Sequence, residues 1–412
     1  MQLQVFLSLL PPGEAWRRLE EHLECGPRRV EMVDLLDAHG RVLAEDVTSP
    51  ADLPGFPRST VDGFAVRARD TFGATESMPA LLAVAGEVRI GDAPCFALRP
   101  GECARVATGA MLPQGADAVV MVEATMETGG NLVAVDKAVA PGENAIGPAE
   151  DVARGAVLLK KGARLRPQDI GALAAAGVSR VKVAAKPNVA IMSTGDELVE
   201  VAATPPPGKV RDTNLYSLCA AVLAAGGRPL AAGIVRDDYQ ELAAAMRERL
   251  ASADMLVVSG GSSIGARDFT RDAIDSLGPP GVLVHGVAVK PGKPTIIAVA
   301  GGKPVFGLPG HPVSCLTVFR LFVEPAIARW MGTVPERREL VARLGANVPS
   351  AAGREDYVGV HVVTRDGEVW ADPVFTKSSL ISGLVASTGI IRIPADAEGL
   401  EKGARVTVSL LF

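Results

Sequence analysis

The segment VVSGGSSIGARDF, residues 257–269, joins an apolar run to a turn rich in glycine and serine that could hold a charged ligand. Its glycine spacing resembles a P-loop, but that motif needs Lys and then Ser or Thr where this chain has Ala266 and Arg267. A nucleophile elbow needs a strand that runs directly into the serine, whereas this apolar run ends several residues earlier. The segment therefore predicts a backbone nest for an anion, with Ser263 and Asp268 available for polar contacts.

Two further loops carry groups that suit an oxyanion. KPGKP offers the ammonium groups of Lys290 and Lys293 on a turn that its prolines stiffen, although an ordinary solvated turn is the alternative for this motif alone. GLPGHPVS places Ser314 and free backbone N–H groups at the start of an expected helix, where a second anion could bind. His311 in that loop is as consistent with a structural role as with a catalytic one.

Three acidic residues, Glu197, Asp237 and Asp268, follow expected strand ends. Their carboxylate oxygens suit Mg²⁺ bound against a phosphate. A single Asp in such a loop is usually a turn or cap residue, but three around one crevice beside two lysines favour a ligand site. Together, these loops predict a site for a phosphorylated ligand and an additional oxyanion, and the chemistry alone names neither.

The elements that position these loops alternate between strand and helix. Strands are predicted over 188–194, 229–235 and 254–260, and helices over 214–227, 238–251 and from Phe269 onward. This alternation predicts a doubly wound α/β domain over residues 184–331. Because ligands bind beyond the carboxyl ends of the strands in such sheets, the loops described above fall at the expected site.

The rest of the chain predicts an α/β multidomain protein. Residues 52–148 consist of short β-rich runs separated by Gly and Pro, which indicate an inserted β domain. Trp16, Leu19 and Leu23 have helical spacing, and a short helix is expected before Gly40. We therefore expect a split helical dimerisation unit over 1–51 and 149–183, and a C-terminal β-barrel over 332–412.

Composition restricts the class of protein. The 412-residue chain is 48% hydrophobic and has a net charge of −5, which argues against a nucleic-acid binder because no basic stripe is present. Its five cysteines are scattered without a C-x-x-C pair, as expected for reduced thiols in a cytoplasmic protein without a zinc or iron–sulfur site. Neither a signal peptide nor an apolar run long enough for a membrane span is predicted.

The motifs taken together resemble a known family. STVDGFAVR, TGAMLPQGADAVVMVE, STGDEL, VRDTN, GIVRDD, VVSGGSSIGARDF, KPGKP and GLPGHPVS are similar, in order, to the MoeA-type molybdopterin molybdenumtransferases, which include the E domain of gephyrin. The resemblance covers about residues 14–331, with a weaker likeness in GREDY and KSSLISG. It implies an L-shaped homodimer of four-domain subunits, with contacts to other molybdenum cofactor biosynthesis proteins as a possibility.

The resemblance also implies an activity. Such enzymes ligate molybdate to the dithiolene of adenylated molybdopterin, use a divalent cation such as Mg²⁺, and release AMP and molybdenum cofactor. Molybdopterin adenylate and molybdate would then be the substrates, and Thr108, Asp62 and Asp151 would line the dimer cleft opposite Glu197 and Asp237. Neither nucleic acid nor a membrane is an expected partner.

Individual roles follow from the same resemblance. The implied catalytic residues are Ser263, Asp268, Lys290, Lys293, Asp62 and Asp151. The implied residues for the pterin, adenylate and oxyanion are Thr108, Thr194, Gly195, Gly260, Gly261, Pro309, Pro312, Ser314, Arg354, Ser378 and Ser379. The implied magnesium ligands are Glu197, Asp237 and Asp268.

Three positions depart from the family pattern. Ala149 stands in place of the glycine of a GED motif, Gly286 where lysine is common, and His311 where asparagine is common. These departures leave open a tungstate-preferring enzyme and a molybdopterin-binding scaffold with little turnover. A nucleotide-phosphate hydrolase that uses the same α/β site is a further alternative.

Overall fold

The computed structural model describes residues 9–261 and 269–411. The chain folds into two compact units. The first comprises Met1–Glu31, Gly40–Ala44 and Val183–Phe412, and the second comprises Met32–His39 and Glu45–Lys182. The finer domain boundaries given above stay a prediction.

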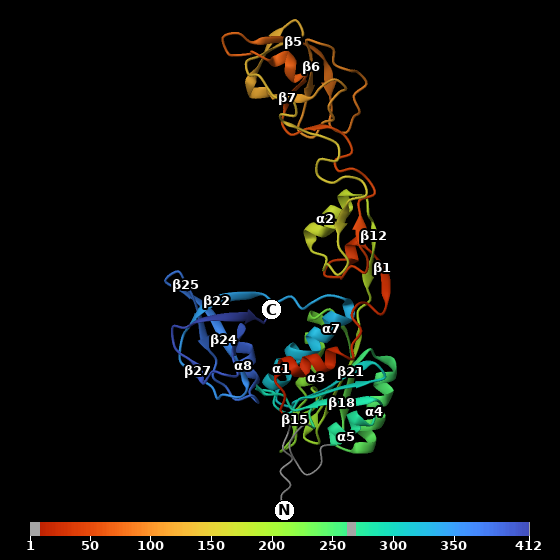
Figure 1. Ribbon diagram of the computed structural model, residues 1–412, viewed down its shortest axis with the longest axis vertical. Helices are drawn as coiled ribbons and strands as arrows, with labels where there is room; N and C mark the ends of the chain where they lie inside the picture. The colour runs from red at the N-terminus through yellow and green to blue at the C-terminus, as the bar shows by residue number, and fades with distance from the viewer. Residues whose placement is uncertain (1–8, 262–268, 412) are drawn as a thin grey trace, which may run out of the picture. The chain divides into compact units, whose positions relative to one another are not determined.

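A six-stranded sheet forms the centre of the first unit (Figure 1). Its strands, in spatial order, are β16 (Arg228–Val235), β13 (Asn188–Thr194), β17 (Met255–Ser259), β21 (Lys303–Leu308), β20 (Ile296–Ala300) and β18 (Pro280–His285). β13 runs parallel to β16 and to β17, whereas β20 is antiparallel to both of its neighbours. From β13 the chain moves first to one side and then to the other, so a topological switch point lies between β13 and β17.

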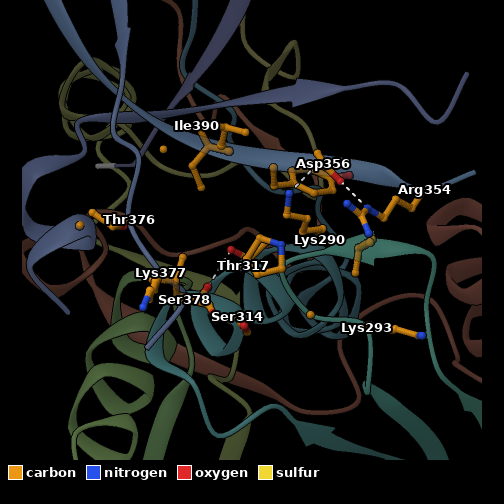
Figure 2. Close-up of a pocket in the computed structure, with 18 of the residues that line it drawn as sticks. Lys290, Lys293, Ser314, Thr317, Arg354, Asp356, Thr376, Lys377, Ser378 and Ile390 are labelled. Carbon is orange, nitrogen blue, oxygen red and sulfur yellow. Dashed lines mark hydrogen bonds and ion pairs between the residues drawn. The ribbon is translucent and has the colours of Figure 1, made fainter. Parts of the chain in front are cut away.

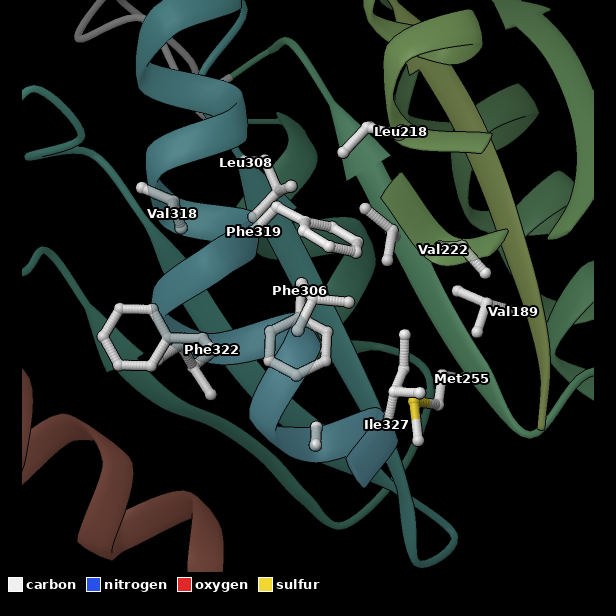
Figure 3. Close-up of a cluster of buried hydrophobic side chains, with 14 of the residues drawn as sticks. Val189, Leu218, Val222, Met255, Phe306, Leu308, Val318, Phe319, Phe322 and Ile327 are labelled. Carbon is white, nitrogen blue, oxygen red and sulfur yellow. The ribbon is translucent and has the colours of Figure 1, made fainter. Parts of the chain in front are cut away.

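Helices cover both faces of this sheet because its strands carry apolar side chains on both faces. They are α3 (Asn214–Ala224), α4 (Tyr239–Ser252), α5 (Phe269–Asp275), α6 (Pro312–Val318), the π-helix η4 (Phe319–Val323) and α7 (Glu324–Met331). Val189 and Phe306 pack with α3, α6 and α7, while Met192 and Leu256 pack with α4 and α5. Figure 3 shows the first of these two cores. The predicted doubly wound α/β fold is confirmed.

The N-terminal helix α1 (Pro12–Glu20) also belongs to the first unit. Ala15 and Leu19 are completely buried in the core that contains Phe306, and Trp16 packs against its edge. The helix predicted before Gly40 is only the 3₁₀ turn η1 (Leu35–Asp37). The residues preceding it form β1 (Val30–Asp34), which pairs with β12 (Arg180–Ala184).

A second six-stranded sheet forms the β domain of the second unit. In spatial order its strands are β7 (Ala118–Met121), β4 (Gly63–Val66), β6 (Glu102–Val106), β5 (Ala80–Val88), β9 (Leu132–Val135) and β8 (Thr125–Gly129). Phe64, Leu82 and Val120 fill its core. A Cβ at Gly63 would lie 1.9 Å from the carbonyl oxygen of Val120, so the pairing of β4 with β7 requires glycine.

Short strand pairs bring the two ends of this inserted segment together. β2 (Val47–Thr48) pairs with β11 (Val157–Leu159), and β3 (Arg58–Ser59) pairs with β10 (Ala145–Ile146). The helix α2 (Pro167–Ala175) follows, and Gly177 ends that turn with a φ of 78°. The fold class expected from the sequence, with an inserted β domain, is confirmed; of the helices expected in the split unit, α2 lies in the second unit, whereas α1 packs in the core of the first.

The C-terminal region forms a closed five-stranded barrel within the first unit. Its strands are β22 (Glu339–Leu344), β24 (Glu355–Arg365), β25 (Glu368–Pro373), β26 (Gly389–Ile393) and β28 (Arg405–Leu410), and the pairing of β24 with β26 closes it. Asp366 and Gly367 have positive φ, as the tight turn between β24 and β25 requires. The predicted barrel is therefore present.

Two short elements extend this barrel toward the α/β domain. β19 (Val289–Lys290) pairs with β24, and α8 (Ile381–Ala386) contacts α6. The remaining short elements are η2 (Ala68–Thr71), η3 (Val122–Ala124), β14 (Leu198–Val199), β15 (Val210–Arg211), β23 (Val348–Pro349) and β27 (Gly399–Leu400). In the described ranges, no helix combines the length and apolar character that crossing a membrane requires.

Candidate active site

Two glycines, Gly260 and Gly261, lie at the switch point between β13 and β17, where there is no room for a side chain. A Cβ at Gly260 would lie 2.0 Å from the carbonyl oxygen of Thr194, and Gly260 has a φ of 102°. A Cβ at Gly261 would lie 2.0 Å from the hydroxyl oxygen of Thr270. Both positions therefore favour glycine, because the chain just after β17 passes close to the Thr194 carbonyl and to the Thr270 side chain. Ser263 and Asp268, which follow in the sequence, lie outside the described residues.

Two of the three expected magnesium ligands border the same strand end. The Thr194 hydroxyl donates a hydrogen bond of 2.5 Å to Asp237 Oδ1. The Glu197 carboxylate lies over Gly195, with both oxygens 2.9 Å from the place a Cβ would take. Within residues 9–261 and 269–411, no three acidic, His or Cys side chains gather closely enough to hold a metal unaided. Two carboxylates nevertheless suit Mg²⁺, which usually completes its coordination with water and substrate phosphate.

We call the polar residues at the ends of these strands, Thr194, Glu197 and Asp237, the strand-end cluster. Asp212 and Asn214 also belong to it, although the sequence did not single them out. Asn214 Nδ2 donates to the Ser259 hydroxyl and to the Gly310 carbonyl, each at 2.7 Å. Asp212 is 3% exposed, and in the described part of the chain its Oδ2 has no hydrogen-bond partner. The motif VRDTN contained both residues, but nothing in it showed that the two side chains are buried.

The loop of Pro309–Pro312 connects this cluster with the barrel. A Cβ at Gly310 would lie 3.6 Å from the Gly260 Cα, so the loop packs directly on the glycine turn. His311 Nδ1 lies 3.0 Å from the Ser378 hydroxyl, and the Val313 N–H donates to the Ser378 carbonyl at 3.2 Å. Pro312 then begins α6. His311 thus has the structural contact that the sequence left open.

A cavity of about 690 Å³ lies where α6 and the KPGKP loop meet the barrel (Figure 2). Five of the residues expected to hold the oxyanion line it: Lys290, Lys293, Ser314, Arg354 and Ser378. Ser379 is exposed and does not line this cavity. Lys377 does line it and was not expected. We call this space the cation cavity.

Asp356 fixes two of the cations in this cavity. Its Oδ2 lies 3.3 Å from Lys290 Nζ, and its Oδ1 accepts a hydrogen bond of 2.9 Å from Arg354 Nε. The Asp356 side chain is 2% exposed, compared with 56% for Lys290 and 38% for Arg354. β19 and β24 pair with Lys290 opposite Asp356, so backbone register aligns the two residues. GREDY contained Asp356, but only the fold places it beside Lys290.

The remaining site residues lie in the second unit. Asp62 accepts hydrogen bonds from the Thr108 backbone N–H at 2.7 Å and from its hydroxyl at 2.9 Å. These two bonds, the backbone one first, lower the pKa of Asp62. Asp62 also lines a cavity of about 370 Å³ together with Arg89 and Arg105. Asp151 is exposed, and its backbone N–H donates to the Leu53 carbonyl.

Two of the positions that depart from the family pattern have special backbone geometry. Ala149 has a φ of 59°, in the left-handed region that glycine adopts more easily. Gly286 has a φ of 101°, which a side chain such as lysine would strain. The local backbone therefore favours Gly286 as it stands and tolerates Ala149 at a cost.

Known families match nearly the whole chain. Residues 10–177 match the MoeA N-terminal region (domain I and II), residues 190–329 a probable molybdopterin binding domain, and residues 341–411 the MoeA C-terminal region (domain IV). The molybdopterin molybdenumtransferase of Bacillus subtilis is 36% identical over 98% of this chain and 94% of its own. This chain belongs to the MoeA family.

A further relative and a solved structure support the same family assignment. Molybdopterin molybdenumtransferase 2 of Mycobacterium tuberculosis is 35% identical over 91% of this chain and 94% of its own. The solved MoeA protein of Pyrococcus horikoshii OT3 has a TM-score of 0.86 and 34% identity, and the match covers 98% of this chain and 100% of that chain. The MoeA resemblance read from the motifs is confirmed.

Proposed function

We propose that this MoeA-family protein works in molybdenum cofactor biosynthesis as a molybdopterin molybdenumtransferase, and that it inserts molybdate into the dithiolene of adenylated molybdopterin with release of AMP. The observation that carries the proposal is the cation cavity, in which Asp356 holds Lys290 and Arg354 in place before any substrate arrives. The loop through Gly310 and His311 joins this cavity to the glycine-lined switch point.

The charges of the cation cavity suit an oxyanion. Lys290, Lys293, Arg354 and Lys377 outnumber the lining carboxylate of Asp356. Molybdate carries two negative charges, and a neighbouring phosphate repels it strongly in a partly dry crevice. Cations already held in position offset that repulsion without reorganising during the reaction. We therefore assign Lys290, Lys293, Ser314, Arg354 and Ser378 to oxyanion binding, and we leave Ser379 out of this set.

The strand-end cluster is proposed to hold the adenylate. Backbone N–H groups of the turn that begins at Gly260 and Gly261 would bind its phosphate, with Ser263 and Asp268 serving binding and cleavage. Mg²⁺ would be held by Glu197 and Asp237, with Asp268 as the third expected ligand. When bound, the ion supplies positive charge against the phosphates. Thr194 holds the Asp237 carboxylate in place through its hydroxyl.

The second unit is proposed to act through a homodimer. Asp62, Thr108 and Asp151 would then line a cleft that the partner subunit completes, as the family resemblance implies. Light scattering should show a dimer at micromolar concentration, whereas a monomer would remove the role given to Asp62 and Asp151. We place the reaction in the cytoplasm, with other molybdenum cofactor biosynthesis proteins as candidate partners.

AMP release from adenylated molybdopterin tests the activity directly. The purified protein should be assayed with Mg²⁺ and with molybdate, with tungstate and with neither, beside Asp268→Asn. We expect release that depends on the oxyanion and is lost in Asp268→Asn. Tight pterin binding without release under any condition would favour a scaffold, and turnover of simple nucleotides without pterin would favour a hydrolase.

A further inference from the structure

We propose that a second cavity of the first unit binds a small organic phosphate. This cavity has a volume of about 560 Å³ and lies between η4 and the barrel. Its lining includes four arginines from a helix, a loop and two strands: Arg320, Arg337, Arg392 and Arg405. We call it the arginine cavity, and neither the family resemblance nor the proposed reaction assigns a role to it.

Arg320 is held in a fixed orientation beside the cavity and keeps one N–H group without a partner in the described part of the chain. Its Nη2 donates to the Leu410 carbonyl at 2.6 Å and to the Ser409 hydroxyl at 2.8 Å, which fixes the orientation of the guanidinium. Its Nη1 is buried and has no hydrogen-bond partner among residues 9–261 and 269–411. Burial first, and then the nearby charge of Arg337, lower the pKa of Arg320. An anion in the cavity would stabilise the charged form of this guanidinium.

The charge balance of the arginine cavity remains positive after its neighbours are counted. Glu324 lies 3.3 Å from Arg337, and Glu355 lies 3.4 Å from Arg392, so each offsets one arginine. Arg320 and Arg405 remain, and the one acidic residue among the described residues that line the cavity is Glu339, whose charge acts on Arg320. Two guanidinium groups against one carboxylate leave a net attraction for an anion.

The size of the cavity and its apolar wall indicate that the phosphate should carry an organic group. Leu321, Ile390, Pro394 and Leu400 line it beside the arginines. Its volume lies within the range of sites for small organic molecules and far exceeds that of an inorganic oxyanion. A phosphate would lie against the guanidinium groups, which bind it in a bidentate manner, and an organic body would cover the apolar wall.

The arginine cavity borders the cation cavity without being part of it. Thr317, Tyr357 and Ile390 line both spaces, but none of the lysines of the cation cavity lines the arginine cavity as described. The two cavities can therefore be tested separately, and the inference does not depend on the proposed reaction.

Isothermal titration calorimetry with ribose 5-phosphate tests this site, with inorganic phosphate and ribose as comparison ligands. We expect one molecule of ribose 5-phosphate to bind per chain, at least about ten-fold more tightly than inorganic phosphate, and no binding of ribose. Arg405→Gln should weaken ribose 5-phosphate binding by about ten-fold or more, because a charge-assisted hydrogen bond is lost. Arg392→Gln is a second rim variant, preferred to Arg320 because Arg320 also anchors Leu410.

Two matched variants complete the test. Arg343 lies opposite Arg405 on the neighbouring strand and outside the cavity, so Arg343→Gln makes the same charge change and should leave binding unaltered. Lys290→Gln in the cation cavity should also leave it unaltered. The proposal is overturned if the unaltered protein does not bind ribose 5-phosphate or binds inorganic phosphate as tightly. It is also overturned if Lys290→Gln loses binding that Arg405→Gln keeps.

Discussion

The strand-end cluster and the cation cavity lie in the same unit but are built in different ways. At the strand ends, the Thr194 carbonyl leaves no room for a Cβ at Gly260 and the Thr270 hydroxyl leaves none at Gly261, and the polar groups follow shortly after β13 and β16. In the cation cavity, Lys290 comes from β19 and Arg354 directly precedes β24 of the barrel, and one buried carboxylate holds them together.

This difference has a physical consequence. The glycines of the strand-end cluster depend on steric fit, because a Cβ at Gly260 meets a backbone carbonyl and a Cβ at Gly261 meets the side chain of Thr270. The cation cavity depends on charge, because half-exposed cations surround one buried carboxylate. Substitutions of the glycines at the first site should therefore affect folding, and substitutions of the cations at the second should affect anion binding.

The largest effect is expected for Gly260→Ala. The new Cβ would meet the Thr194 carbonyl oxygen at 2.0 Å on a backbone with a φ of 102°, so overpacking and strain add together. We expect the free energy of unfolding to fall by about 3 kcal/mol or more in urea titrations. Gly155→Ala is the matched control, because its φ is 83° but nothing lies within 4 Å of its Cβ position. Equal losses in the two variants would show that crowding at β13 is not the cause.

Lys290→Gln should change anion binding and leave folding almost intact. Loss of one charge-assisted contact predicts a rise of about ten-fold in the molybdate concentration that half-saturates AMP release. Arg365→Gln, which removes a barrel charge paired with Asp372, should leave that concentration unchanged. An equal rise in both variants would assign the effect to net charge and would contradict a specific role for Lys290.

Asp237→Asn should change the Mg²⁺ dependence of the reaction and leave its molybdate dependence unchanged. We expect the Mg²⁺ concentration that supports half-maximal AMP release to rise several-fold, because a neutral amide is a weaker ligand than a carboxylate. The half-saturating molybdate concentration should stay the same. Asp196→Asn, in the loop that follows the neighbouring strand β13, makes the same change at an exposed carboxylate and provides the control. A change in molybdate dependence alone would contradict the assignment of Asp237.

The smallest effect concerns Asp62 in the second unit. Thr108→Val removes the hydroxyl donor and keeps the backbone N–H donor, so the pKa of Asp62 should rise part of the way toward 3.8. A depressed pKa in the folded state stabilises the protein above the unfolded value, and that contribution is lost as pH falls. NMR titration of the carboxyl carbon measures this shift. A pKa that does not change would show that the backbone bond acts alone.

The sequence predicts the strand-end cluster better than the cation cavity for a physical reason. Strand, turn and helix follow one another locally there, so the ends of β13 and β17 could be located from apolar runs and glycines. Lys290 and Arg354 were expected from their motifs, but Asp356 and Lys377 were not. Their roles arise because the barrel packs against the KPGKP loop, and no local pattern encodes that contact.

The other differences between the sequence predictions and the structure also arise from contacts between residues far apart in the chain. The segment before Gly40 was expected to be a helix, but only the 3₁₀ turn Leu35–Asp37 forms there, after β1. Asp212 and Asn214 stood in a quoted motif, yet their burial became visible only when α3 packed beside Ser259 and Gly310. Long-range pairing and burial thus decide what short motifs leave open.

The central claim is that the cation cavity holds the oxyanion. Crystals of the protein soaked with molybdate, measured by anomalous diffraction at the molybdenum absorption edge, test it most directly. The account predicts one strong anomalous peak beside Lys290, Arg354 and Ser378, absent from crystals of Arg354→Gln. A peak at the strand ends of β13 and β17 with none in the cavity would contradict the claim.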